Sequence, residues 1–145
     1  MQLSDHFSLK EFTHSDTAIR LDIDNTPDQN VLINLNILAE GLETVRTKLD
    51  GNAIRVSSGY RSLILNRALH SKDTSQHILG LACDFTCPGF GNVNDVMRTL
   101  SQSGIEFQQL ILEFNSWIHI SFPPAGQIAK REILLIDKQG TRFYR

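Results

Sequence analysis

One stretch in the first half of the chain constrains the fold most, because its apolar residues recur at helical spacing. After Thr26-Pro27-Asp28 they lie three and four positions apart, at Val31, Leu32, Leu35, Leu38, Ala39, Leu42, Val45 and Leu49. This spacing predicts an amphipathic helix that ends near Asp50-Gly51, where glycine accepts a left-handed backbone. The apolar stripe of the helix is most simply a face of the hydrophobic core.

The remaining periodic segments are short and predict strands mixed with smaller helices. Apolar, β-branched runs predict strands at 53–58, 81–86, 107–113 and 117–122, and a last hairpin from 132–136 and 141–144. Helices are predicted at 62–69 and from Asn92 or Asn94 to about Ser101. Residues 1–27 are expected to form an irregular arm with one short helix, in which Ser8 and Glu11 match a capping box.

Helices interspersed with hairpin-linked strands predict an α+β fold, a small, mostly antiparallel sheet with flanking helices. A chain of 145 residues fits one domain over 1–145, with the arm of residues 1–27 packed on it.

The charge balance and hydropathy exclude several classes of protein. Lysine plus arginine number 14 against 16 aspartate plus glutamate, a net charge of −2, which argues against binding nucleic acid or an anionic membrane through bulk charge. No basic flank precedes an apolar run at the start, and no apolar stretch approaches about 18 residues. We therefore expect a protein without a signal peptide or membrane insertion, made in the cytoplasm. Cys83 and Cys87 are expected to be small buried residues or free thiols.

Two segments carry side chains suited to metal chemistry. The first runs from Ser75 to Asp84 and contains His77; the second runs from Glu113 to His119. Alternation along a strand places Trp117, His119 and Ser121 on one face, so His119 can face a cleft. Gly80 permits a tight path between His77 and the strand of Asp84, which allows both side chains to reach one metal ion.

Two imidazoles and one carboxylate form the protein part of a catalytic zinc site, with a fourth position open for water. Such a zinc ion lowers the pKa of its water to about 7, and Glu113 is the best candidate for the base that accepts the proton. Taken singly, each feature has a structural alternative. A His beside an Asp is often a polar pair, Glu113 alone resembles a strand-edge charge, and Trp117 alone resembles a packing residue.

Together these segments resemble the zinc D-Ala-D-Ala carboxypeptidases and the bacteriophage L-alanyl-D-glutamate endopeptidases, whose fold is shared with the hedgehog signalling domain. The resemblance covers nearly the whole chain. It rests on Ser75-x-His77-x-x-Gly80-x-Ala82-x-Asp84, Trp117-x-His119, Ser58-Gly59-Tyr60-Arg61 and Ser4-x-His6-Phe7-Ser8-Leu9-x-Glu11-Phe12. The last of these motifs is similar to the opening of the small phage-type members.

The resemblance implies a role for each residue of the site. His77, Asp84 and His119 become the ligands of one zinc ion, Glu113 the general base, and Arg61 the group that steadies the scissile carbonyl. Tyr60, Ser75, Trp117 and Ser121 are candidates for substrate binding or for supporting the ligands. One departure concerns the base: many carboxypeptidase members carry the acid three residues before the last histidine, where this chain has Ser116. Here the acid lies six residues before, as in the hedgehog-type arrangement.

The function expected from this resemblance is hydrolysis of a peptide bond in the peptidoglycan stem peptide. A D,D-carboxypeptidase and an endolysin-type endopeptidase both fit the residues. The protein would wait in the host cytoplasm until release or travel in the virion, where phage proteins would be its partners. The alternatives are a non-catalytic, metal-stabilised binding or virion-assembly module on the same fold, and a small structural domain without metal.

Overall fold

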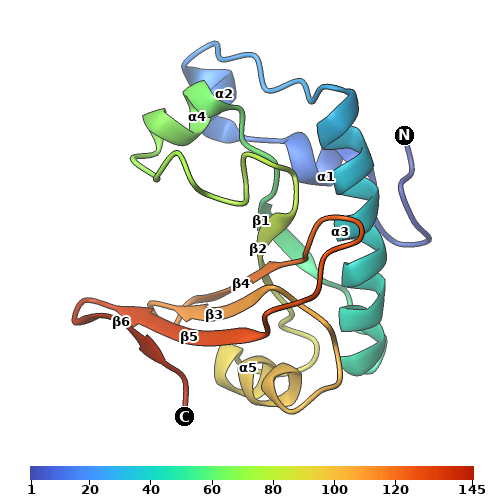
Figure 1. Ribbon diagram of the computed structural model, residues 1–145, viewed down its shortest axis with the longest axis vertical. Helices are drawn as coiled ribbons and strands as arrows, with labels where there is room; N and C mark the ends of the chain where they lie inside the picture. Colours follow the sequence, from blue (N-terminus) through green and yellow to red (C-terminus); the bar gives the residue numbers. More distant parts are fainter.

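The computed structural model describes all residues 1–145 and places helices on both sides of one six-stranded sheet (Figure 1). The helices are α1 (Leu9–Thr13), α2 (Asp16–Arg20), α3 (Gln29–Lys48), α4 (Leu63–Ala68) and α5 (Val93–Ser101). The strands are β1 (Arg55–Ser58), β2 (Ala82–Thr86), β3 (Gln109–Glu113), β4 (Trp117–Ser121), β5 (Glu132–Asp137) and β6 (Gly140–Phe143).

The sheet has the order β1-β2-β4-β3-β5-β6, and only the β3–β5 pair is parallel. The predicted α+β class with a mostly antiparallel sheet is therefore confirmed. The predicted hairpins 107–122 and 132–144 both form. Strands β3 and β4 are two and one residues shorter than predicted, whereas β5 is one residue longer and β6 begins one residue earlier and ends one residue earlier.

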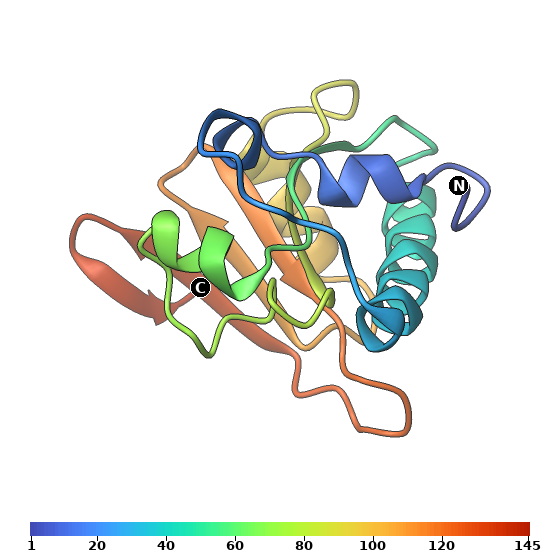
Figure 2. The ribbon, with the colours of Figure 1, turned by 90° about the horizontal axis from the view of Figure 1, so that it is seen from above.

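One face of the sheet is apolar and packs on helices. Cys83 and Phe85 from β2, Ile118 and Ile120 from β4, and Leu110 from β3 belong to one core cluster, which also contains the buried residues of α3 and α5. In Figure 1, α5 lies beneath the sheet, whereas α2 and α4 lie above it, and Figure 2 looks down onto α4 from that upper side. The opposite, upper face is thus left for polar side chains.

The N-terminal arm contains two short helices, so the prediction of a single one is wrong. The capping box of Ser8 and Glu11 forms at α1 as predicted. The Ser15 side chain accepts a hydrogen bond from the Ala18 backbone N–H and so caps the start of the second helix, α2. This helix has only five residues, too few for its periodicity to be visible in the sequence. The rings of Phe7 and Phe12 stack 5.9 Å apart within the main core, which ties the arm to the sheet.

The long helix α3 confirms the periodicity prediction. Its N-cap is Asp28, whose side chain accepts from the Val31 N–H, and the chain leaves the helix through Gly51 in the left-handed region (φ 73°). Cys83 and Cys87 are both buried and free. None of the helices is long and apolar enough to cross a membrane.

Candidate metal centre

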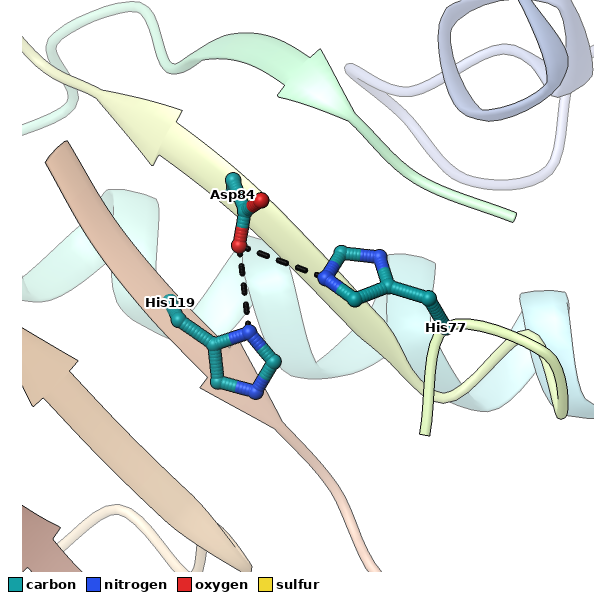
Figure 3. A group of neighbouring side chains, drawn as sticks. All are labelled: His77, Asp84 and His119. Atoms are coloured by element: carbon teal, nitrogen blue, oxygen red, sulfur yellow. Dashed lines mark hydrogen bonds and ion pairs between the residues drawn. The ribbon is translucent and has the colours of Figure 1, made fainter. Parts of the chain in front are cut away.

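Three polar side chains meet on the upper face of the sheet, and strand register brings two of them together. Asp84 of β2 lies directly opposite His119 of β4, so both side chains project from the same face. Asp84 Oδ1 lies 3.1 Å from His119 Nδ1 and 3.3 Å from His77 Nε2 (Figure 3). The exposed fractions are 3% for His77 and 8% for both Asp84 and His119. The sequence-predicted ligands therefore form one buried cluster.

His77 reaches this cluster from a turn outside the sheet. Gly80 adopts the left-handed region (φ 76°), and a Cβ there would lie 2.9 Å from Val31 Cγ1, so the turn needs glycine on both counts. The His77 Nδ1–H donates to the Gly59 carbonyl oxygen across 2.7 Å. A Cβ on Gly59 would lie 2.6 Å from the Phe12 carbonyl oxygen, so glycine lets the arm pack against this segment.

The Gly59 carbonyl fixes the tautomer of His77. A carbonyl oxygen can only accept, so Nδ1 carries the proton and the Nε2 lone pair faces Asp84 Oδ1. Burial lowers the pKa of His77 and so disfavours a second proton on the ring. Two lone pairs that face each other in a buried site repel, and a cation between them removes this cost.

The donor set and its spacing fit a metal ion. The ligand atoms of His77, Asp84 and His119 all lie within 4.8 Å of one another. Metal–ligand bonds of about 2.0 to 2.1 Å in a tetrahedral site place the ligand atoms roughly 3.3 Å apart. The separations from Asp84 Oδ1 lie close to that distance, so this group could hold a metal ion with little rearrangement.

Asp84 is held ionised by its neighbours. Burial opposes ionisation, but the adjacent His119 and His77 rings outweigh it, and the pKa of Asp84 falls well below its ordinary value. The second carboxylate oxygen, Oδ2, lies 3.5 Å from the Arg61 guanidinium. Arg61 is itself fixed, since its Nε donates to Ser58 Oγ and its Nη1 to the Asn66 amide oxygen. The structure thus brings Arg61 to the cluster, on the oxygen that faces away from the histidines.

Glu113 lies on the same face of the sheet as the cluster. It pairs directly with Trp117 across β3 and β4, and Trp117 shares a face with His119 two residues further along. Burial raises the pKa of Glu113 and the Asp84 carboxylate adds to the rise, whereas His119, the Trp117 indole and Arg61 act in the opposite direction. A carboxyl with a raised pKa in a half-buried site has the electrostatic character of a general base.

The other four predicted site residues occupy different surroundings. Ser75 lies beside the cluster, where its Oγ accepts from the His77 backbone N–H. Ser121 is fully buried and accepts from the Gln109 N–H, which is a structural contact. Tyr60 lines a separate hollow on the α2 and α4 side, together with Arg61. Trp117 has a buried indole N–H that meets no partner at hydrogen-bonding geometry.

Asn66 is a supporting residue that sequence reasoning missed. This side chain is fully buried; its amide oxygen accepts from Arg61, and its amide N–H donates to the Lys72 carbonyl. Asn66 therefore links Arg61 to the loop that precedes His77. The sequence did offer one signal. Asn66 lies in a helix that directly follows Arg61, at a position that faces inward and would normally be apolar.

A groove of about 600 Å³ opens beside His119. Its upper wall is the loop 71–76, and its floor comes from β3, β5 and β6 together with Gln108 and Lys130, which precede β3 and β5. Only two of its 13 lining residues are hydrophobic, so the groove is polar. The lining residues are Ser71, Lys72, Thr74, Ser75, Gln76, Gln108, Gln109, Ile111, His119, Lys130, Glu132, Ile136 and Thr141.

Comparison with known protein families decides the classification. The family model described as Peptidase M15 matches residues 5–121, which include the whole cluster, Arg61 and Glu113. The chain belongs to the peptidase M15 family. This is the family of the D-Ala-D-Ala carboxypeptidases and phage endopeptidases, so the resemblance seen in the sequence is confirmed. No curated protein matches the chain significantly. Strands β5 and β6 lie outside the matched residues of this M15 metallopeptidase.

Proposed function

We propose that the protein is a zinc peptidase that hydrolyses a peptide bond in the stem peptide of peptidoglycan. One observation carries this proposal: the His77 Nε2 lone pair and an Asp84 oxygen face each other across 3.3 Å in a buried site, with His119 beside them. In a member of the M15 family, this arrangement is best explained as the ligand set of a catalytic metal.

Zinc suits the donors better than the other common divalent ions. Imidazole nitrogens favour zinc over calcium or magnesium, which prefer oxygen ligands throughout. Three protein ligands leave one position free, as in catalytic rather than structural zinc sites. A zinc ion bound by His77, Asp84 and His119 supplies a Lewis acid that activates water and polarises a peptide carbonyl.

Glu113 and Arg61 have separate roles, in proton transfer and in charge stabilisation. Glu113 takes a proton from the attacking water and returns it to the leaving amine, for which its raised pKa is suited. Arg61 holds Asp84 through Oδ2 and keeps a permanent positive charge near the carbonyl oxygen as negative charge develops on it. Ser75 supports the ligands by fixing the backbone of His77.

The groove supports a polar peptide substrate. Lys72 on the upper wall and Lys130 on the floor are exposed and make no ion pair, and Glu132 accepts a hydrogen bond from the Gln109 side chain. Stem peptides carry carboxylates and amides along their length, which match such a lining better than they match an apolar pocket. The substrate then lies across the floor strands with its scissile bond beside His119.

Hydrolysis of purified cell wall by the zinc-loaded protein tests this proposal. The wild-type chain should release peptide fragments, whereas Glu113→Gln should retain zinc but turn over on the order of 10² times more slowly or less. Glu106→Gln is the matched control because it makes the same change at an exposed residue outside the groove and the cluster, and it should retain the activity. Zinc binding without release of fragments by the wild type would instead favour the non-catalytic binding or assembly module.

A further inference from the structure

Trp117 is a side chain at the site whose polar group takes no part in the arrangement described so far. Its Nε1–H is buried without a partner, one of only two buried side-chain polar atoms in the chain left in this state. Buried donors are nearly always paired, so an unpaired one beside a reactive cluster calls for a functional explanation.

The β3–β4 hairpin holds this indole next to Glu113. Glu113 and Trp117 form the last pair of the ladder, so their side chains are direct cross-strand neighbours on the cluster face. The indole lies close enough to be among the groups that lower the pKa of Glu113, although it does not reach hydrogen-bonding geometry.

The turn between these two residues is strained in a way that fixes the indole. Phe114 and Asn115 both adopt the left-handed region, with φ of 52° and 51°. Asparagine tolerates this conformation, but a bulky aromatic residue rarely adopts it. The Phe114 ring packs against the Trp117 ring, with centroids 5.6 Å apart and planes at 39°. Phe114 therefore restricts the movement of the indole through this ring contact.

We propose that Trp117 is a positioning residue that donates its indole N–H to the Glu113 carboxylate and aims this base at the reacting water. The inference rests on the proposed role of Glu113. It explains why a tryptophan, rather than any other large apolar residue, faces the glutamate. It also gives the strained Phe114 a function, because its ring contact keeps the donor in place.

The indole resonance tests the contact directly, because Trp117 is the only tryptophan in the chain. In the ¹⁵N-labelled, zinc-loaded protein, we expect a single downfield indole proton that exchanges slowly with solvent. Glu113→Ala should move this peak upfield and speed its exchange, and Glu113→Gln should give a smaller change if the alanine variant does not fold. Glu132→Ala is the control and should leave the peak in place. An indole peak unaffected by both Glu113 variants would overturn the proposal.

Kinetics then test the positioning role. Trp117→Phe keeps an aromatic ring but removes the N–H, and it should lower kcat about tenfold with little change in KM, the scale of one lost hydrogen bond to a charged group. Replacement by 3-benzothienylalanine, which keeps the shape of the indole, should give the same loss. Unchanged kcat in both variants would overturn the positioning role. A wild-type chain that hydrolyses no cell-wall peptide would instead defeat the proposed function, and the indole resonance would still decide whether the contact exists.

Discussion

Two regions of the sheet differ sharply in how deeply their residues are buried. Strands β2 and β4, which carry Asp84 and His119, are buried over nearly their whole length. Strands β5 and β6 have no fully buried residue, and none occurs anywhere after Phe122. The buried pair lies within the part of the chain that matches the M15 family, and the exposed pair lies beyond it.

This difference indicates that the buried strands hold the metal ligands and that the exposed hairpin forms part of the substrate groove. A metal cluster needs ligands held rigidly in a dry site, which β2 and β4 supply through direct register. The exposed hairpin contributes Glu132, Ile136 and Thr141 to the groove but no side chain to the buried part of the core. We therefore expect substitutions in the buried region to abolish the chemistry and substitutions in the hairpin to alter substrate binding.

The largest effect is expected from removing a ligand in the buried region. Asp84→Ala or His119→Ala should eliminate stable zinc binding, because two donors remain where three are needed, and hydrolysis should fall to background. Zinc content by atomic absorption and fragment release from cell wall measure the two effects. Glu132→Ala, in the exposed region, should retain its zinc. Full activity in either ligand variant would remove the proposed centre.

A smaller effect is expected from the groove wall. Thr141→Arg places a long cationic side chain on the exposed strand β6, where it projects into the groove without disturbing the core. KM for a stem-peptide substrate should rise about tenfold, which corresponds to ~1.4 kcal/mol of binding, while kcat stays nearly constant. Arg142 lies next in the strand with its side chain on the opposite face, so Arg142→Gln should leave KM unchanged. Equal KM values for wild type and Thr141→Arg would show that substrate does not touch the hairpin.

The smallest effect concerns the stability of the hairpin itself. Asp137 and Arg142 form an exposed ion pair, and the hydrogen bonds from Arg142 lower the pKa of Asp137 to about 2 from 3.8. Because the pKa is lower in the folded chain, the pair stabilises at neutral pH, and this contribution disappears as pH falls from about 4 to about 2. Asp137→Asn should therefore lower the melting temperature slightly at pH 7, with a difference that shrinks below pH 4. A difference that is constant with pH would exclude this pair as its cause.

The sequence predicted the buried region better than the exposed one. Period-two alternation gave the faces of Asp84 and His119, and Gly80 marked the turn that carries His77; all three residues do meet. The hairpin 132–144 was predicted, but its parallel pairing with β3 depends on contacts distant in sequence, which no local pattern specifies. The groove that this pairing creates was therefore not foreseen.

Other features of the site depended on backbone geometry that side-chain patterns do not reveal. The acceptor for His77 is the Gly59 carbonyl, and any residue type offers a carbonyl, so the motif around Gly59 did not identify it. Asn66 was likewise hidden, because a buried amide in a short helix resembles an exposed polar position until the packing is known. The second helix of the arm was missed because five residues are too few to show helical periodicity.

The central claim is tested most directly by mass spectrometry of the products from a defined stem peptide. The zinc-loaded chain should cut one peptide bond and yield two fragments whose summed mass exceeds that of the substrate by one water. Terminal cleavage would identify a carboxypeptidase and internal cleavage an endopeptidase. Removal of zinc with a chelator should stop the reaction, and added zinc should restore it. An intact substrate after long incubation with protein that demonstrably holds zinc at His77, Asp84 and His119 would contradict the account.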